Sequence, residues 1–272
     1  MDYVLDYADQ YVLDNVYAGS GLALARDDLY RQALSLFVIV NLGGYFLYFL
    51  FAGLDYFFLF DHGLMKHPKF LKNQVALEIA VSCKAIPVMA VLTTVLFLLE
   101  VRGYSQLYDD VSLYGGWPYI LFSIFGFLAF TDMGIYWIHR WLHIPWLYQP
   151  IHKLHHKWIV PTPFASHAFH PLDGFLQSVP YHVAVFAFPV HKWVYLGLFV
   201  FVNIWTVSIH DGYYNVPALL KGVLNSAQHH TLHHTRFRVN YGQYFVFWDK
   251  IGGSYKAPAE GDLLAKNVLK EN

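Results

Sequence analysis

Charged residues are scarce in this 272-residue chain: Asp, Glu, Lys and Arg make up 14% of it, whereas hydrophobic residues make up 56%. That balance excludes an ordinary soluble domain, in which about 25% of residues are charged. The formal net charge of −1 and the lack of a basic stripe interleaved with aromatics argue against nucleic-acid binding. The single cysteine, Cys83, excludes an intramolecular disulfide and any zinc site built on paired cysteines.

The chain also lacks linkers, and its first residues lack the pattern of a secretory signal peptide, since six aspartates lie between Met1 and Asp28. Long uncharged stretches are abundant instead. Stretches of about 20 residues are long enough to cross a bilayer core of about 30 Å, and shorter ones suit a hairpin. Three long stretches, one of which contains only Lys84, and two of 18 residues occur: Gln32–Leu54, Ile79–Leu99, Val111–Thr131, Gly174–His191 and Trp193–His210.

Histidine is the other abundant residue. Of the 16 histidines, seven lie between His139 and His170, and four lie between His229 and His234. Three groups, one H-x-x-x-H and two H-x-x-H-H, have the spacing that puts imidazoles on one face of a helix. Eight imidazoles exceed what one ion can hold, so the spacing indicates two ions. The eight predicted ligands are His139, His143, His152, His155, His156, His230, His233 and His234.

The two histidine windows must lie on the same membrane face if they build one site. Residues 174–210 must then enter and leave on that face, as a hairpin or a pair of short helices. Basic residues near the windows and in the loop between the first two long stretches place this face in the cytosol by the positive-inside rule. They include Lys66, Lys69, Lys72, Arg140, Lys153 and Lys157.

We therefore predict an all-α fold, a polytopic membrane helical bundle with about four to five membrane segments and a cytosolic histidine-rich cap for two metal ions. The expected parts of this single domain are an N-terminal segment (1–31), three spans (32–131), a cap (132–173 and 211–257), a membrane hairpin (174–210) and a short tail (258–272).

The motifs and placements that the sequence lacks limit the kinds of metal site that it can form. A zinc protease would carry H-E-x-x-H, which does not occur. A bis-histidine haem would need ligands at mid-membrane, and a zinc transporter usually places its ligands within its spans. Non-haem iron at the cytosolic membrane edge, oxidising a lipid from the bilayer, is the most economical interpretation. A metal transporter or a non-catalytic membrane scaffold is the alternative from another class.

The three histidine boxes resemble those of the fatty acid hydroxylase and sterol desaturase superfamily. The flanking segments carry a closer resemblance, to animal sterol C-5 desaturases (lathosterol oxidases), over about residues 27–256. The segments are Leu64–Gln74, Pro163–Gly174, Asn203–Gly212 and Asn240–Ser254.

The resemblance implies an endoplasmic reticulum enzyme of sterol and cholesterol biosynthesis that converts lathosterol to 7-dehydrocholesterol. Two iron ions would use dioxygen, with electrons from NADH or NADPH through cytochrome b5 and its reductase. A related di-iron hydroxylase or sterol methyl oxidase stays open as an alternative, because the boxes alone are compatible with desaturation and with hydroxylation. Further candidates, as ligands or as groups that orient the imidazoles, are His167, His170, His210, His229, Asp132, Asp173 and Asp211.

Overall fold

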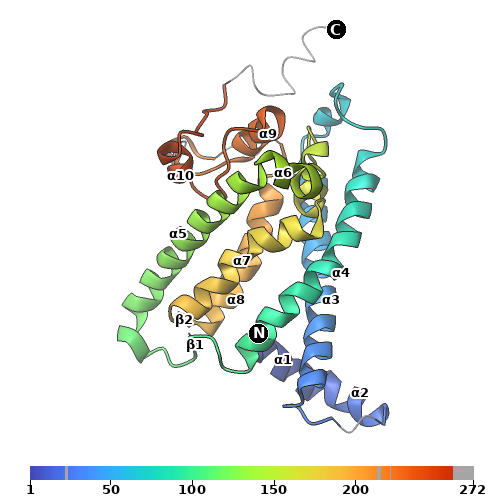
Figure 1. Ribbon diagram of the computed structural model, residues 1–272, viewed down its shortest axis with the longest axis vertical. Helices are drawn as coiled ribbons and strands as arrows, with labels where there is room; N and C mark the ends of the chain where they lie inside the picture. Colours follow the sequence, from blue (N-terminus) through green and yellow to red (C-terminus); the bar gives the residue numbers. More distant parts are fainter. Residues whose placement is uncertain (22–23, 213–215, 221, 260–272) are drawn as a thin grey trace.

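The long helices of the protein form a bundle, with a cap of short elements at one end (Figure 1). The computed structural model describes residues 1–21, 24–212, 216–220 and 222–259, so most of the predicted tail lies outside the described residues. The bundle consists of α3 (Leu29–Phe58), α4 (Gln74–Val101), α5 (Trp117–Leu142), α7 (Pro171–Ala187) and α8 (Lys192–Ser208).

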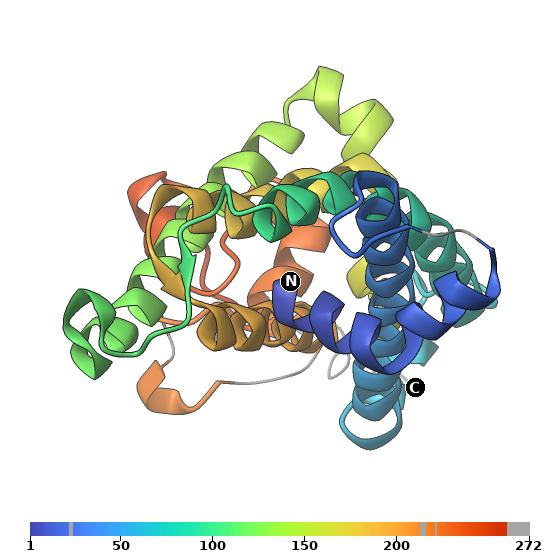
Figure 2. The same ribbon diagram turned by 90° about the horizontal axis from the view of Figure 1, so that it is seen from below.

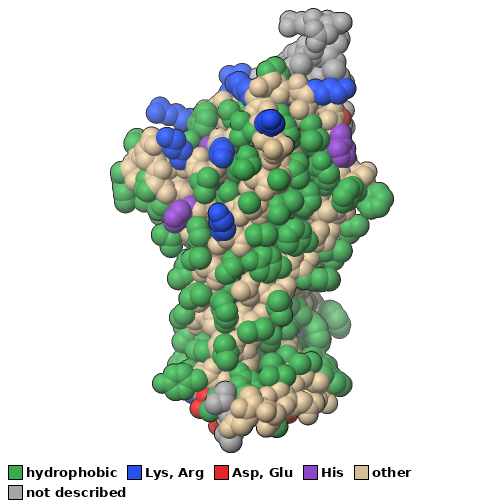
Figure 3. Space-filling view, turned by 90° about the vertical axis from the view of Figure 1, so that its right-hand side faces the viewer, with side chains coloured by type: hydrophobic (Ala, Val, Ile, Leu, Met, Phe, Trp, Pro, Cys, Tyr) green, Lys and Arg blue, Asp and Glu red, His purple; other side chains and the backbone are tan. Residues whose placement is uncertain are grey.

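Three of these helices are long and apolar enough to cross a membrane: α3, α4 and α5, with 30, 28 and 26 residues. Even the shortest spans about 39 Å at 1.5 Å per residue, more than a bilayer core of about 30 Å. Large apolar side chains such as Phe46, Val95 and Phe125 point outward. Hydrophobic side chains cover the middle of the molecule, and Lys and Arg gather at one end (Figure 3). The fold class predicted from the sequence is confirmed: this is an all-α, multi-pass membrane protein.

The helices α7 and α8 are a pair of short helices. Each has 17 residues, about 26 Å, which falls short of a full span. At their turn, the extended Phe188 ends α7, and the two-residue strand β2 (Val190–His191) pairs in parallel with β1 (Leu107–Tyr108). This pairing ties the hairpin to the connection between α4 and α5.

The N-terminal segment lies across the opposite end of the bundle from the cap (Figure 2). It comprises α1 (Asp2–Ala8), the π-helical η1 (Asp9–Leu13) and α2 (Asp14–Gly19). Arg31, buried near the start of α3, donates to Asp9 and Asp14 at 2.6 Å each and holds the segment against the bundle.

The cap is built from short elements that meet the ends of α5 and the hairpin (Figure 1). Its helices are η2 (His62–Lys66), α6 (Pro145–Leu147), η4 (Tyr148–His152), η5 (His155–Lys157), η6 (Pro163–His167), η7 (Ala218–Leu220), α9 (Ala227–Arg236) and α10 (Phe247–Ile251); one further 3-10 turn, η3 (Leu113–Gly115), lies before α5. The second histidine box is therefore not one continuous helix, because a turn separates the π-helical η4 from η5. The bundle core between the long helices and the hairpin includes Leu36, Phe97, Phe127, Ile135 and Val185.

Candidate metal centre and adjoining cavity

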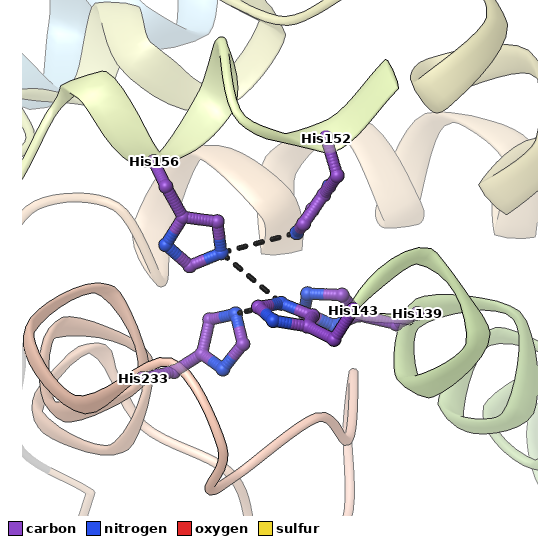
Figure 4. Close-up of side chains that lie close together, drawn as sticks. All are labelled: His139, His143, His152, His156 and His233. Atoms are coloured by element: carbon purple, nitrogen blue, oxygen red, sulfur yellow. Dashed lines mark hydrogen bonds between the residues drawn. The ribbon is translucent and has the colours of Figure 1, made fainter. Parts of the chain in front are cut away.

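Five histidines meet in the cap and could hold one metal ion: His139, His143, His152, His156 and His233. The first two come from the end of α5, the next two from η4 and η5, and the last from α9 (Figure 4). The helix α5 continues past the predicted boundary at Thr131 to Leu142, and this extension carries the first box into the cap.

A second group of four buried histidines lies next to the first: His155, His210, His230 and His234. The rings of His156 and His234, one from each group, have centroids 4.8 Å apart. His210 follows α8, so the hairpin returns to the cap and contributes a residue there. The sequence marked His210 only as a further candidate, and the structure places it among the boxes.

Each H-x-x-H-H box divides between the two groups. His152 and His156, four residues apart, face the first group, whereas His155 faces the second. In α9 the division is reversed, because His230 and His234 face the second group and His233 the first. The two groups therefore share both segments.

Backbone carbonyls fix the orientation of several rings. Nδ1 of His139 lies 3.0 Å from the Tyr241 carbonyl, and Nδ1 of His233 lies 2.7 Å from the Val239 carbonyl. A carbonyl only accepts, so each Nδ1 carries the proton and donates it. Each Nε2 is left with a lone pair that points into the first group, and Nε2 of His139 has no hydrogen-bond partner among the described residues. His210 is held in the same way by the Thr206 carbonyl, at 2.6 Å.

The Nε2 atoms converge on one another. In the first group, Nε2 of His156 lies 3.1 Å from Nε2 of both His143 and His152. In the second group, Nε2 of His210 lies 3.0 Å from Nε2 of His230. A proton can bridge only one such pair at a time, whereas a cation can accept all the lone pairs. These separations are those of neighbouring imidazoles bonded to one ion at about 2.1 Å, the length of a zinc–imidazole bond. The residues present therefore fit a metal in each group.

Burial favours the neutral form of seven of these imidazoles. It holds the pKa of His210 and of the six histidines named below under the usual 6.5, because a charged ring would lose its hydration there, and repulsion between neighbouring rings adds to the effect. For His210, burial lowers the pKa to about 4. Neutral imidazole is the form that binds metals. The other residues so affected are His143, His155, His156, His230, His233 and His234.

Three other candidate histidines lie outside both groups. Nδ1 of His229 faces Ser226 and completes the capping box at the start of α9. Nδ1 of His170 accepts from the backbone N–H of Leu172 and caps α7. His229 and His170 therefore have roles in helix capping. His167 lies at the end of η6.

The candidate aspartates differ from one another in their partners. Asp173 accepts from Nδ1 of His152 at 2.7 Å, and both side chains are fully buried. Asp132 instead accepts from the backbone N–H groups of Tyr244 and Phe245, so it positions a loop and no imidazole. Asp211 is buried directly after His210. Asp173 is thus hydrogen-bonded to an imidazole, as a group that orients the ring would be.

A cavity of about 380 Å³ adjoins both groups of histidines. Its lining includes His139 from the first group and His155, His210 and His230 from the second. From there it extends between α3, α4, α7 and α8 to Met1, at the far end of the bundle. Aliphatic and aromatic side chains form most of its wall, so it suits an apolar ligand that reaches the histidines from within the membrane region.

The carbonyls of Thr206, Val239 and Tyr241 are functional groups that the sequence could not indicate. Any residue type supplies a backbone carbonyl, so no sequence signal marks these positions. Tyr148 is a further residue at the site, since its ring centroid lies 5.5 Å from that of His143. Its only sequence signal is weak: it is an aromatic residue just before the second box.

Fold and site together define a helical membrane protein with two adjoining polyhistidine groups beside an apolar cavity. Residues 124–254, which include every box, match the family model "Fatty acid hydroxylase". Lathosterol oxidases are similar over nearly the whole chain. The rat protein is 56% identical over 261 residues, covering 95% of this chain and 86% of the relative. The human protein is 56% identical over 264 residues with the same coverage.

A fungal relative is likewise similar over nearly the whole chain. The delta(7)-sterol 5(6)-desaturase erg31 of Schizosaccharomyces pombe is 53% identical over 262 residues, covering 96% of this chain and 85% of its own length. No solved structure matches the chain at a significant level. The protein belongs to the fatty acid hydroxylase family, in the group that contains the lathosterol oxidases and delta(7)-sterol 5(6)-desaturases.

Proposed function

We propose that this protein is a sterol C-5 desaturase, which introduces the double bond between carbons 5 and 6 of a delta-7 sterol. Relatives named lathosterol oxidase and delta(7)-sterol 5(6)-desaturase support the substrate and the position of the bond. Lathosterol would then become 7-dehydrocholesterol. The observation that carries the proposal is the cavity. It joins an apolar channel at membrane depth to two groups of neutral imidazoles, so a lipid can reach a metal centre without crossing water.

Nine histidines would hold two iron ions, five at the first and four at the second. Within the described part of the chain, both groups consist of histidines alone, and imidazole suits iron as well as zinc and copper. When bound, the iron would supply the activation of dioxygen and the removal of two hydrogens from the sterol. Iron is preferred to zinc here because desaturation requires a redox-active metal.

The protein's own residues would orient the imidazoles and exclude water from the site. Asp173 and the carbonyls of Val239 and Tyr241 hold their imidazoles so that each Nε2 stays available to a metal. The ring of Tyr148 packs against His143 and that of Phe237 against His156, and both aromatic rings are partly exposed, so they would limit the access of water to these histidines. Exclusion of water protects reactive species from side reactions. The apolar cavity wall would fix the sterol skeleton, and small misplacement of reacting groups changes rates strongly.

The cap, residues 132–173 and 211–257, would face the cytosol in the endoplasmic reticulum membrane. Exposed lysines on this end, including Lys66, Lys153 and Lys157, support that orientation by the positive-inside rule. They also form a positive surface near the histidines, to which the acidic electron donor cytochrome b5 would dock. Its reductase would deliver electrons from NADH or NADPH. The remaining expected parts, including the membrane hairpin 174–210, remain predictions.

The test is a microsomal assay in cells without their own sterol C-5 desaturase, supplied with lathosterol, NADH and oxygen. Wild type should form the conjugated diene, which absorbs in the ultraviolet, and purified wild type should contain two iron ions per chain. His233→Ala should form no diene. The matched variant His170→Ala, outside both groups, should retain bound iron.

The products separate the alternatives. A hydroxylated sterol in place of the diene would overturn desaturation and assign the protein to a hydroxylase branch of the family. Well-folded wild type that leaves lathosterol unchanged and contains no iron would overturn the enzymatic function altogether.

A further inference from the structure

The imidazole of His182, on α7, lines the cavity far from both histidine groups, and its side chain is only 1% exposed. Its Nδ1 lies 3.3 Å from the Tyr195 hydroxyl, which donates to Glu100 at 2.9 Å. Neither Tyr195 nor Glu100 lines the cavity, so Nδ1 is turned into the wall. Among the described residues, Nε2 of His182 has no hydrogen-bond partner. The ring therefore has one polar atom left for a ligand.

This atom can bind a hydroxyl group in every protonation state of the ring. Nε2 accepts a hydrogen bond when it carries no proton, and it donates one when it does. A hydroxyl group both donates and accepts, so it can bond to Nε2 in either case. A hydrocarbon can bond in neither case, and it would leave a buried polar atom without a partner, which is unfavourable.

The neighbouring polar groups of α7 already have partners. The Ser178 hydroxyl donates to the Phe175 carbonyl at 2.7 Å, and the hydroxyls of Tyr181 and Tyr244 lie 2.6 Å apart. Thr93 is a further hydroxyl in the cavity wall, on α4. It precedes Glu100 by seven residues, roughly 10 Å along α4 toward the cap, so a ligand at Thr93 and one at His182 are distinguishable.

Two helices give the distance from His182 to the histidine groups. α7 leads from the cap toward the other end of the bundle (Figure 1), and Asp173, which holds a histidine of the first group, precedes His182 by nine residues, roughly 14 Å. In α8, Tyr195 precedes Thr206 by eleven residues, roughly 17 Å, and the Thr206 carbonyl holds a histidine of the second group. A ligand that contacts both His182 and the metal centre must therefore be long.

We propose that Nε2 of His182 binds a hydroxyl group near the end of a sterol side chain, so that the cavity accepts side-chain-hydroxylated delta-7 sterols. This inference rests on the proposed function, because it starts from carbon 5 beside the metal centre. The hydroxyl on carbon 3 is two bonds from carbon 5 and cannot reach His182. Carbon 25, near the end of the side chain, is about eleven bonds from carbon 5, roughly 14 Å at about 1.3 Å of advance per carbon–carbon bond of about 1.5 Å. That length matches the distance along α7.

The test compares the 25-hydroxy derivative of lathosterol with its 20-hydroxy isomer. Both bind to purified, iron-loaded protein kept anaerobic so that neither is consumed, and competition with labelled lathosterol gives the dissociation constants. Carbon 20 is about four bonds nearer the rings, so its hydroxyl stops roughly 5 Å short of that on carbon 25. Wild type should bind the 25-hydroxy sterol about three- to tenfold more tightly, the ratio that one net hydrogen bond supplies.

Two variants complete the design. His182→Leu replaces the imidazole by a hydrocarbon side chain and leaves the hydrogen bond between Tyr195 and Glu100 in place, so the ratio should fall to near one. Thr93→Val is the matched control, because it removes a hydroxyl from the wall of the same cavity with little change in volume. It should keep the wild-type ratio whatever its overall affinity.

Equal binding of the two isomers by wild type would overturn the inference, whether or not His182→Leu folds. An undiminished ratio in folded His182→Leu would overturn it as well, and loss of the preference in Thr93→Val would assign the hydroxyl to Thr93 instead. The proposed function fails separately, if wild type prefers the 25-hydroxy sterol but forms no diene from lathosterol.

Discussion

The buried pair of His152 and Asp173 supports a graded prediction about metal affinity. Asp173 accepts from His152 Nδ1 and from Gln177 Nε2, each at 2.7 Å. Asp173→Asn removes the charge but keeps an acceptor for His152, since Gln177 can turn its amide to accept from the new NH2 group. Asp173→Ala removes the acceptor altogether and leaves the buried Nδ1 proton without a partner.

The magnitudes follow from these partners. A hydrogen bond to a charged group contributes about 1.5 to 3 kcal/mol, which corresponds to about 10- to 100-fold in an equilibrium constant. Loss of such a partner from a metal-binding histidine typically weakens metal binding by about 10- to 100-fold. We therefore expect Asp173→Asn near the lower end and Asp173→Ala near the upper end. His152 faces only the first group, so the ion in that group should weaken more than the ion in the second.

The assay is anaerobic competition for ferrous iron between purified protein and a chelator, with thermal unfolding measured in parallel. Asp132→Asn is the matched control: its carboxylate is equally buried but accepts from backbone N–H groups, so it should leave both affinities near wild type. The reasoning is refuted if folded Asp173→Ala binds both ions as tightly as wild type, or if Asp132→Asn loses as much affinity.

Three further predictions concern the site and its support. His143→Ala should lose one bound metal ion, whereas His170→Ala should keep two, as metal analysis of the purified proteins will show. Gly252→Ala should lower stability by roughly 1 to 3 kcal/mol, measured as a lower melting temperature, because a Cβ there would overlap the Tyr136 hydroxyl. Burial lowers the pKa of His229 to about 4 from 6.5, so the unfolded chain takes up the proton first. Its contribution to stability is complete above about pH 6.5 and decreases toward pH 4, and unfolding of metal-free protein at several pH values should show this decrease.

The sequence predicts the bundle well because the bilayer imposes a simple rule of length and apolarity. Each long uncharged stretch lies largely within a helix, and each helix extends beyond its stretch at one end or both. In α5 the polar residues after Thr131 continue the helix to Leu142, since backbone hydrogen bonding does not stop where the apolar side chains end. Hydropathy therefore locates a span and misses the turns that carry its functional residues.

The site was less fully predictable. Spacing found the eight box histidines because residues four apart share a helix face, as His139 and His143 do. It could not assign His155 to the other group, since η4 and η5 are not one helix. His210 belongs to none of the spaced histidine boxes. It reaches His230 only because the hairpin returns to the cap. Sequence also could not show that Asp173 contacts an imidazole whereas Asp132 contacts backbone N–H groups, because both contacts are tertiary.

The sharing of α9 between the two groups has a consequence for how metals load. His233 faces one ion and His234 the other, from adjacent positions on one short helix. An ion in either group restrains this helix, and the conformational entropy lost then is not lost again when the other ion binds. Loading should therefore be cooperative. At limiting iron, a mixture of empty and fully loaded molecules should predominate over molecules that contain a single ion.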